Sequence, residues 1–225
     1  MLAAMHTLRH PAAPLAAVHL LLAALAAACS PSGTPLPPGS VLFQDDFSRL
    51  SSGWPSQHTA EAILEYRDGQ YAVLVLAPDA NIWSTPGLDL GSVRLEVDAQ
   101  QIGGPEDNLY GLICRYQDDA NFVFLVVSSD GFAGIGEVRD GERRILGGGA
   151  MLPSDAIAPR GYANHLTAEC LEESLRLSVN GSLAAEAAAH AAPLGDVGVI
   201  VGSYAQAGVE IVFDSFSARV PETSP

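Results

Sequence analysis

Lysine is absent from this chain, and arginine supplies all 11 of its basic side chains. Aspartate and glutamate together number 26, so the formal net charge is −15 at pH 7. Nucleic acids and anionic membrane surfaces both attract clustered positive charge. The composition therefore argues against nucleic acid as a partner and against direct docking on anionic lipid. The acidic excess also leaves carboxylate oxygens available for a hard cation such as calcium.

Cysteine and histidine are too sparse to form a recognisable metal or catalytic motif. Two of the three cysteines, Cys114 and Cys170, have no histidine beside them, which falls short of the four ligands that zinc takes. His58, His165 and His190 are isolated in the sequence. No HExxH motif and no serine–histidine–aspartate order can be read from them.

The chain also has no apolar run of transmembrane length, although an apolar stretch begins at Leu15. It follows a short segment that carries Arg9, and it ends in LAAAC at 25–29. A charged start, an apolar centre and small residues before a cleavage point describe an export signal. A cysteine at that point resembles the lipobox of bacterial lipoproteins, in which the cysteine is diacylated and becomes the new N-terminus. We therefore expect lipidation of Cys29, with ordinary secretion or an uncleaved anchor as the alternatives.

This leader predicts the organisation of the whole chain. Residues 1–28 form the signal peptide, and residues 29–40 form a tether rich in proline, glycine and serine. Residues 41–220 form one domain, and residues 221–225 form a tail. The predicted location is extracytoplasmic, with the lipid anchor as the only contact with the membrane.

Cys114 and Cys170 are the two cysteines that remain if Cys29 is lipidated. Both lie in apolar, strand-like runs, and an oxidising compartment favours a disulfide between them. The alternative is a pair of buried free thiols.

Turn dipeptides divide the domain into short apolar runs. Asp68-Gly69, Asp130-Gly131, Asp140-Gly141 and Asn180-Gly181 each separate two such runs, which is the pattern of a β-hairpin. The predicted strand pairs are 62–66 with 71–76, 122–128 with 132–138, 136–139 with 143–146, and 175–179 with 183–186. Further strands are predicted at 93–99, 110–117, 165–171, 197–202 and 209–220. Many short strands with almost no helical periodicity predict an all-β fold, an antiparallel β-sandwich.

Pairing the strands through their turns predicts one face that mixes charge with aromatic rings. We place Gln117 opposite Phe122, Arg115 opposite Phe124, and Phe124 opposite Glu137. The alternate residues form a core face, namely Leu112, Cys114, Tyr116, Val123, Leu125 and Val127. Aromatic rings with planar polar groups suit sugar recognition. The candidate ligand-binding residues are therefore Arg115, Gln117, Phe122, Phe124 and Glu137. The alternative is that a loop covers this face and that Arg115 and Glu137 form a structural ion pair.

Several segments resemble laminin-G-like domains of the concanavalin A-like lectin and glucanase superfamily. They are LRLSVNGSL at 175–183, GDVGVIVG at 195–202, YGLICRYQ at 110–117, DDANFVF at 118–124, FQDDFS at 43–48 and IVFDSF at 211–216. The chain is also similar to domains described as 3-keto-disaccharide hydrolase-like. The resemblance implies a jelly roll of two sheets, with its first and last strands side by side and a concave face that often binds sugars.

The same resemblance implies a structural calcium near the sheet edge. Asp46 near the first strand and Asp214 on the last strand would then be its ligands. The alternative is that both residues form turns or local hydrogen bonds at strand ends.

A catalytic pair of carboxylates is not identified. A retaining glucanase of this fold is expected to carry Glu-x-Asp-x-Glu on one strand. The nearest run, EVRDGE at 137–142, contains a hairpin turn, and Glu96 with Asp98 lacks the third carboxylate. The leading hypothesis is a non-catalytic glycan-binding module on a lipoprotein. The alternatives are a glycoside hydrolase-type enzyme related to 3-keto-disaccharide hydrolases, and a structural or protein-interaction module of the cell envelope.

Overall fold

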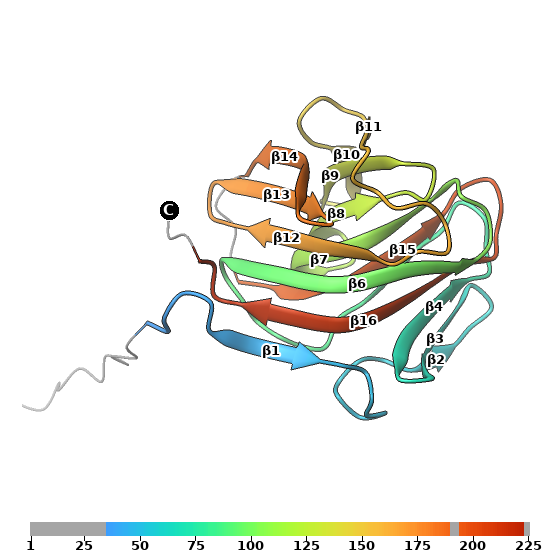
Figure 1. Ribbon diagram of the computed structural model, residues 1–225, viewed down its shortest axis with the longest axis horizontal. Coiled ribbons are helices and arrows are strands. Elements are labelled where there is room, and N and C mark those ends of the chain that lie inside the picture. Colours follow the sequence, from blue (N-terminus) through green and yellow to red (C-terminus); the bar gives the residue numbers. More distant parts are fainter. Residues whose placement is uncertain (1–34, 190–193, 223–225) are drawn as a thin grey trace, which may run out of the picture. The chain divides into compact units, whose positions relative to one another are not determined.

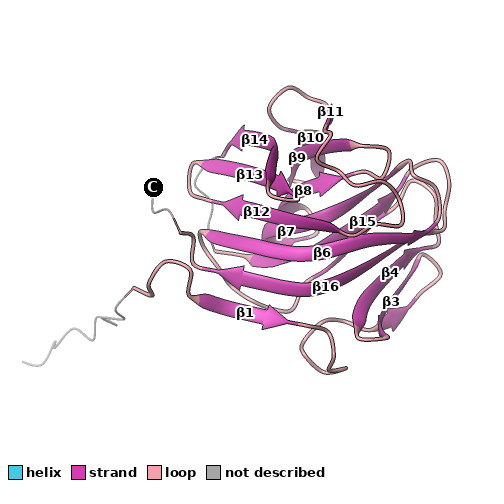
Figure 2. Cartoon of the chain, viewed as in Figure 1, coloured by secondary structure: helices cyan, strands magenta, loops and turns pink. Residues whose placement is uncertain are grey.

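The structure, a computed structural model, describes residues 35–189 and 194–222 of the chain. Its regular structure within those ranges consists of β-strands, which confirms the all-β fold (Figure 2). The same residues contain no helix with the length and apolarity needed to cross a membrane. Cys29 and His190 lie outside the described residues.

Two antiparallel sheets form the two layers of a sandwich (Figure 1). The nine-stranded sheet has the order β14-β13-β12-β6-β16-β4-β3-β2, with β1 paired to β16. Its strands are β1 (Val41–Asp45), β2 (Gln57–His58), β3 (Ala62–Arg67), β4 (Gln70–Val75), β6 (Val93–Gly103), β12 (Asn164–Cys170), β13 (Ser174–Val179), β14 (Ser182–Ala188) and β16 (Val209–Arg219). The pairing of β1 with β16 confirms that the first and last strands lie side by side.

The seven-stranded sheet has the order β10-β9-β8-β7-β15-β5, with β11 paired to β9. Its strands are β5 (Asn81–Ser84), β7 (Asn108–Asp118), β8 (Asn121–Val127), β9 (Phe132–Arg139), β10 (Glu142–Ile145), β11 (Leu152–Pro153) and β15 (Asp196–Ser203).

The main core fills the space between the sheets because apolar residues alternate along the strands. In β6, for example, Val93, Leu95, Val97 and Ala99 are buried while the residues between them are partly exposed. All residues of this core lie within the compact unit Leu36–Pro225. The unit therefore carries its own hydrophobic core, which is the physical requirement for folding alone.

A disulfide joins Cys114 of β7 to Cys170 of β12, with a sequence separation of 56 residues. It links the two sheets through the core, and it confirms the predicted cysteine pair.

The predicted hairpin turns are present. Asp68-Gly69, Asp140-Gly141 and Asn180-Gly181 have positive φ at both residues, which is the geometry of a two-residue turn that follows the twist of its strands. These turns connect β3 to β4, β9 to β10 and β13 to β14.

The predicted register of β7 with β8 is wrong beyond their turn. Asp118 pairs with Asn121 as expected, but a bulge follows, and Cys114 pairs with Val123 rather than with Leu125. Arg115 lies in this bulge with φ of 57°. The extra residues turn Tyr116 away from the main core, so its predicted core position is also wrong. Its ring packs against Phe122 on the other face of the sheet.

The predicted register of β8 with β9 is wrong by one residue. Phe124 pairs with Gly136, and Glu137 pairs with Val123. A shift of one residue moves a side chain to the opposite face of a sheet. Glu137 therefore shares the inner face with Val123, and it does not lie beside Phe124.

Candidate functional site

The outward face of the seven-stranded sheet carries a second apolar cluster. Its buried members are Leu109, Ile113, Phe122, Phe124, Val126 and Ile200. Phe122 is 5% exposed and Phe124 is 1% exposed. Trp83 and Tyr116 pack against Phe122, with ring centroids 5.1 Å and 5.9 Å away.

The Phe124 ring is enclosed from two sides. The guanidinium carbon of Arg143 lies 4.8 Å from its centroid. The ring also lies against Gly136 of β9, since a Cβ added to Gly136 would lie 2.2 Å from a ring carbon. Because both Phe122 and Phe124 are this deeply buried, neither ring offers an open stacking surface to a ligand in this structure.

A cleft of about 360 Å³ lies at one end of the sandwich, where β7 to β10 of one sheet meet β13 and β14 of the other. Its polar lining consists of Arg115, Gln117, Asn121, Glu137, Arg139 and Arg144. Its apolar lining consists of Phe122, Val123, Val138, Leu146, Leu175, Ala188 and Ala189. The structure thus brings four of the five candidate binding residues to one cleft. The fifth, Phe124, is not in the lining.

Glu137 is the centre of an ion-pair triad in this cleft. Its side chain is 10% exposed, and Arg139 donates to its Oε2 at 3.1 Å. Arg144 donates to Oε1 through Nε at 2.6 Å, and its Nη2 contacts the same oxygen. The strands explain this geometry. Arg144 of β10 pairs directly with Glu137 of β9, and Arg139 follows two residues later on the same face.

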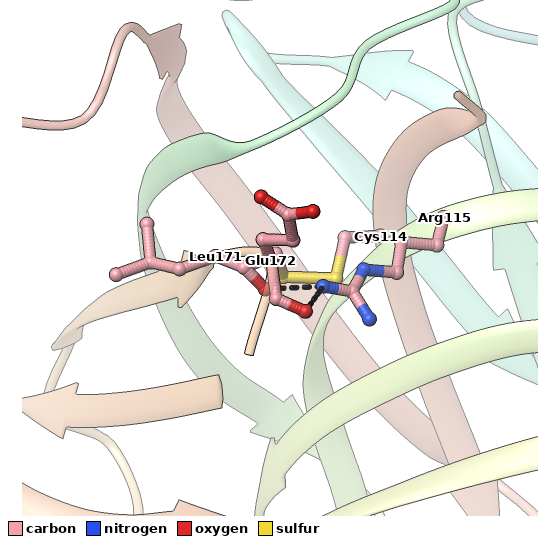
Figure 3. Close-up of a disulfide and its surroundings, with 5 residues drawn as sticks. Cys114, Arg115, Leu171 and Glu172 are labelled. Carbon is pink, nitrogen blue, oxygen red and sulfur yellow. Dashed lines mark hydrogen bonds between the residues drawn. A yellow bond between two sulfur atoms is a disulfide. The ribbon is translucent and has the colours of Figure 1, made fainter. Parts of the chain in front are cut away.

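Arg115 reaches from the bulge of β7 toward the connection between β12 and β13. Its Nη2 donates to the Leu171 carbonyl and lies 3.5 Å from the Glu172 carbonyl (Figure 3). Cys114 and Cys170 directly precede Arg115 and Leu171, so the disulfide holds together the two segments that this hydrogen bond joins. Burial lowers the pKa of Arg115, whereas the charges of Glu137 and Glu172 raise it.

A second polar groove, of about 540 Å³, lies beside β1 and β16. It is lined by Gln44, Asp45, Asp46, Arg49, Ser52, Glu96, His165, Ser215, Phe216, Ser217 and Arg219. Nδ1 of His165 lies 2.8 Å from Oδ1 of Asp98, an interaction across two strands that the sequence does not reveal.

The candidate calcium ligands, Asp46 and Asp214, lie near this groove, but each accepts hydrogen bonds from a serine close to it in the sequence. Asp46 accepts hydrogen bonds from the Ser48 hydroxyl and backbone, which lower the pKa of Asp46. Asp214 accepts from Ser215 at 3.3 Å and pairs with Asp98 across β16 and β6. Within residues 35–189 and 194–222, no three His, Cys, Asp or Glu side chains gather in a way that could hold a metal ion. Calcium binding by Asp46 and Asp214 stays a prediction.

The pairing of Arg144 with Glu137 is a feature of the site that the sequence analysis does not predict. The Asp140-Gly141 turn was recognised, and counting outward from it places residue 144 opposite Glu137. The predicted register instead places Glu137 on the outward face of the sheet, opposite Phe124.

No protein-family model matches the chain, and no curated protein matches it. Solved structures do match in fold. The carbohydrate-binding module CBM66 from Bacillus subtilis has a TM-score of 0.60 at 14% identity, over 75% of this chain and 96% of that chain. A β-glucanase from Bacillus licheniformis has a TM-score of 0.58 at 9% identity, over 79% of this chain and 97% of that chain.

A GH43 protein from Bacillus licheniformis has a TM-score of 0.57 at 16% identity. The match covers 79% of this chain, but the chain spans only 39% of the length of that protein. These identities show the fold alone. The chain is an antiparallel β-sandwich of the class that occurs in carbohydrate-binding modules and glycoside hydrolases. More closely, it has the concanavalin A-like jelly-roll fold that its sequence resembles.

Proposed function

We propose that this protein is a non-catalytic glycan-binding module and that its ligand enters the cleft around Glu137. The observation that carries the proposal is the composition of that cleft, where an apolar floor meets guanidinium, carboxylate and amide groups. The name of one solved structure with the same fold, a carbohydrate-binding module, also supports it.

The cleft suits a sugar ring in size and chemistry. Its volume of about 360 Å³ falls in the range of roughly 300–1,000 Å³ that is typical of small-molecule sites. Val138, Leu146 and Ala188 line the cleft and keep part of their surface exposed, so they offer apolar area for the C–H face of a ring. Glu137 and Gln117 supply acceptors, and the arginines supply paired donors for hydroxyl oxygens.

The hydrolase alternative has less support in this cleft. Glycosidases use two carboxyl groups on either side of the scissile bond. Among the described residues that line the cleft, Glu137 alone carries a carboxylate. We therefore expect binding without release of reducing sugar. Hydrolysis of a bound oligosaccharide by the wild type would favour the glycoside hydrolase reading instead.

The proposed location is outside the cytoplasmic membrane, with the chain anchored through a lipid on Cys29. The support is the leader at 1–28 and its small residues before the cysteine. An oxidising compartment also suits the disulfide between Cys114 and Cys170.

A glycan-array screen of residues 36–225, with and without calcium, tests the binding function. Ala188→Trp places an indole at the wall of the cleft and is expected to abolish every hit by steric exclusion. Leu183→Trp is the matched control because Leu183 lies on the same strand, is 59% exposed and does not line the cleft.

The array result also distinguishes the alternative binding sites and functions. Hits that survive in Ala188→Trp would place binding elsewhere on the surface. Silence across a broad array would reject glycan binding in favour of a structural or protein-interaction module of the envelope.

A further inference from the structure

Positive charge gathers in the cleft of an otherwise acidic protein. Of the 11 arginines in a chain with net charge −15, Arg115, Arg139 and Arg144 all line this one cleft. Glu137 is the one acidic side chain among the described lining residues. The lining therefore has an excess of guanidinium over carboxylate.

In the other arginine ion pairs of the described residues, the carboxylates equal or outnumber the guanidiniums. Arg67 contacts two carboxylates, those of Glu65 and Glu210. Arg176 contacts the carboxylate of Glu186 at 3.0 Å. On the nine-stranded sheet, the pair Arg94 and Arg219 faces two carboxylates, those of Glu96 and Glu169.

In the cleft, by contrast, Arg139 and Arg144 share the single carboxylate of Glu137. Their side chains are 52% and 57% exposed. Each guanidinium has five N–H donors in a planar fork that matches a carboxylate. Glu137 occupies only part of these donors, so the two arginines retain the capacity to bind a second carboxylate beside the first.

Exposed carboxylates next to two of the lining residues, Asn121 and Arg139, form an acidic rim beside the cleft. Asp118, Asp119, Asp140 and Glu142 lie in or beside the turns next to Asn121 and Arg139 and are exposed. The two turns are held together, since the Gly141 amide donates to the Ala120 carbonyl at 3.0 Å. Like charges near the entrance disfavour a long polyanion, whereas a single acidic group on an otherwise neutral chain meets the arginines inside.

We propose that the cleft recognises a glycan through one carboxylate on its terminal residue, which Arg139 and Arg144 bind next to Glu137. This inference rests on the proposed glycan-binding function and names its ligand class as a chain that ends in a single acidic sugar.

Calorimetric titration with matched monosaccharides tests the ligand class. Residues 36–225 are titrated with methyl β-glucuronide against methyl β-glucoside, and with methyl α-galacturonide against methyl α-galactoside. Within a pair the ligands differ only in a carboxylate in place of a hydroxymethyl group. We expect one acidic member to bind about tenfold or more tighter than its neutral partner, because charge-assisted hydrogen bonds are the stronger ones. Added salt is expected to reduce this difference.

Arg144→Gln removes one of the two guanidiniums that face the ligand and is expected to abolish the preference for the acidic sugar. Arg176→Gln is the control, because Arg176 is similarly exposed (47%), pairs with one glutamate and does not line the cleft. Polygalacturonate is expected to bind more weakly per site than the preferred acidic monosaccharide, owing to the acidic rim.

The outcomes distinguish this inference from the function on which it rests. If only neutral sugars bind, or if neutral and acidic partners bind equally, the carboxylate inference is overturned while glycan binding stands. An acidic preference that persists in folded Arg144→Gln also overturns it. If neither these monosaccharides nor any glycan on the array binds, both proposals fail.

Discussion

Tyr71 places a hydroxyl group inside the main core of the sandwich. Its side chain has no exposed surface, and its ring lies among those of Phe47, Trp54 and Tyr66. The hydroxyl donates to the Pro55 carbonyl at 2.6 Å and lies 2.7 Å from the Ser84 hydroxyl. Burial raises the pKa of Tyr71 well above its ordinary value, although the hydrogen bond with Ser84 opposes this shift.

This shift predicts a loss of stability in alkali. The folded state holds the proton more tightly than the unfolded state, so the stabilisation is complete below the ordinary tyrosine pKa of about 10 and declines as the pH rises above it. Burial also raises the pKa of Tyr110, which adds to the effect. Urea unfolding of the wild type is expected to give falling midpoints between about pH 10 and pH 11.

Tyr71→Phe is expected to lower stability at pH 8 by about 1 kcal/mol through the lost hydrogen bonds, and to weaken its dependence on alkaline pH. An unchanged slope in this variant would show that Tyr71 does not ionise on unfolding in that range.

Phe124 is a structural residue in this structure, although it was a candidate for ligand binding. Phe124→Ala is expected to lower the free energy of unfolding by roughly 3–5 kcal/mol, because it empties a buried site between Phe122 and Gly136. Phe132→Ala is the control on the neighbouring strand, since Phe132 is 38% exposed. Chemical unfolding measures both variants, and equal small losses would contradict the assignment of Phe124 to the core.

At the scale of strands and turns, the register of β8 and β9 decides what the cleft contains. A two-residue turn at Asp130-Gly131 would pair Ser129 with Phe132. In the structure the Ser128 amide instead donates to the Phe132 carbonyl at 2.8 Å, and Gly131 has φ of 96°. A three-residue loop with a glycine of positive φ is the next hairpin type after the two-residue turns. The Asp130-Gly131 dipeptide alone does not distinguish a two-residue from a three-residue hairpin loop. The three-residue loop shifts the pairing of β8 with β9 by one residue, so the Glu137 side chain lies on the inner face of the sheet.

The bulge in β7 was less predictable still. Only a few per cent of residues other than glycine adopt positive φ, and nothing in the sequence around Arg115 signals that conformation. The strands themselves were predictable because their apolar alternation and their turn dipeptides agree. The exact pairing at a bulge depends on tertiary contacts such as the Arg115–Leu171 hydrogen bond.

The disulfide connects β7 and β12 and is expected to stabilise both the fold and the cleft. The double variant Cys114→Ala/Cys170→Ala should lose roughly 4 kcal/mol, as expected for opening a loop of this length. Guanidinium unfolding of the oxidised wild type, the reduced wild type and the double variant measures the loss. The two forms without the bond should agree. A double variant as stable as the oxidised wild type would show that strain in the bond cancels its effect.

At the scale of the whole molecule, the fold followed from the sequence but the cleft did not. The hairpin pairs and the sandwich architecture follow from many short turn-linked strands and the segments that resemble known jelly rolls, whereas the order of the other strands in each sheet was not predicted. The cleft requires side chains from both sheets, since Leu175 and Ala188 face Glu137 and Arg144 across it. Which edge of one sheet packs on which edge of the other is not encoded in any local pattern. The pairing of His165 with Asp98 escaped prediction for a different reason, because β12 and β6 are neighbours in one sheet but far apart in the sequence, and no turn sets their register.

The cellular location of the protein is a separate prediction, and it depends on lipidation of Cys29. In cells that process lipoproteins, the full chain is expected to incorporate labelled fatty acid and to partition into the detergent phase. Cys29→Ser removes the acceptor thiol, so the label should be lost and the protein should move to the aqueous phase or remain as an unprocessed precursor. Ser30→Ala is the control, because it alters the neighbouring residue and keeps the thiol. If folded Cys29→Ser stays membrane-bound without label and with an intact leader, the leader itself is the anchor. If the wild type takes up no fatty acid and is released, the chain is secreted in soluble form.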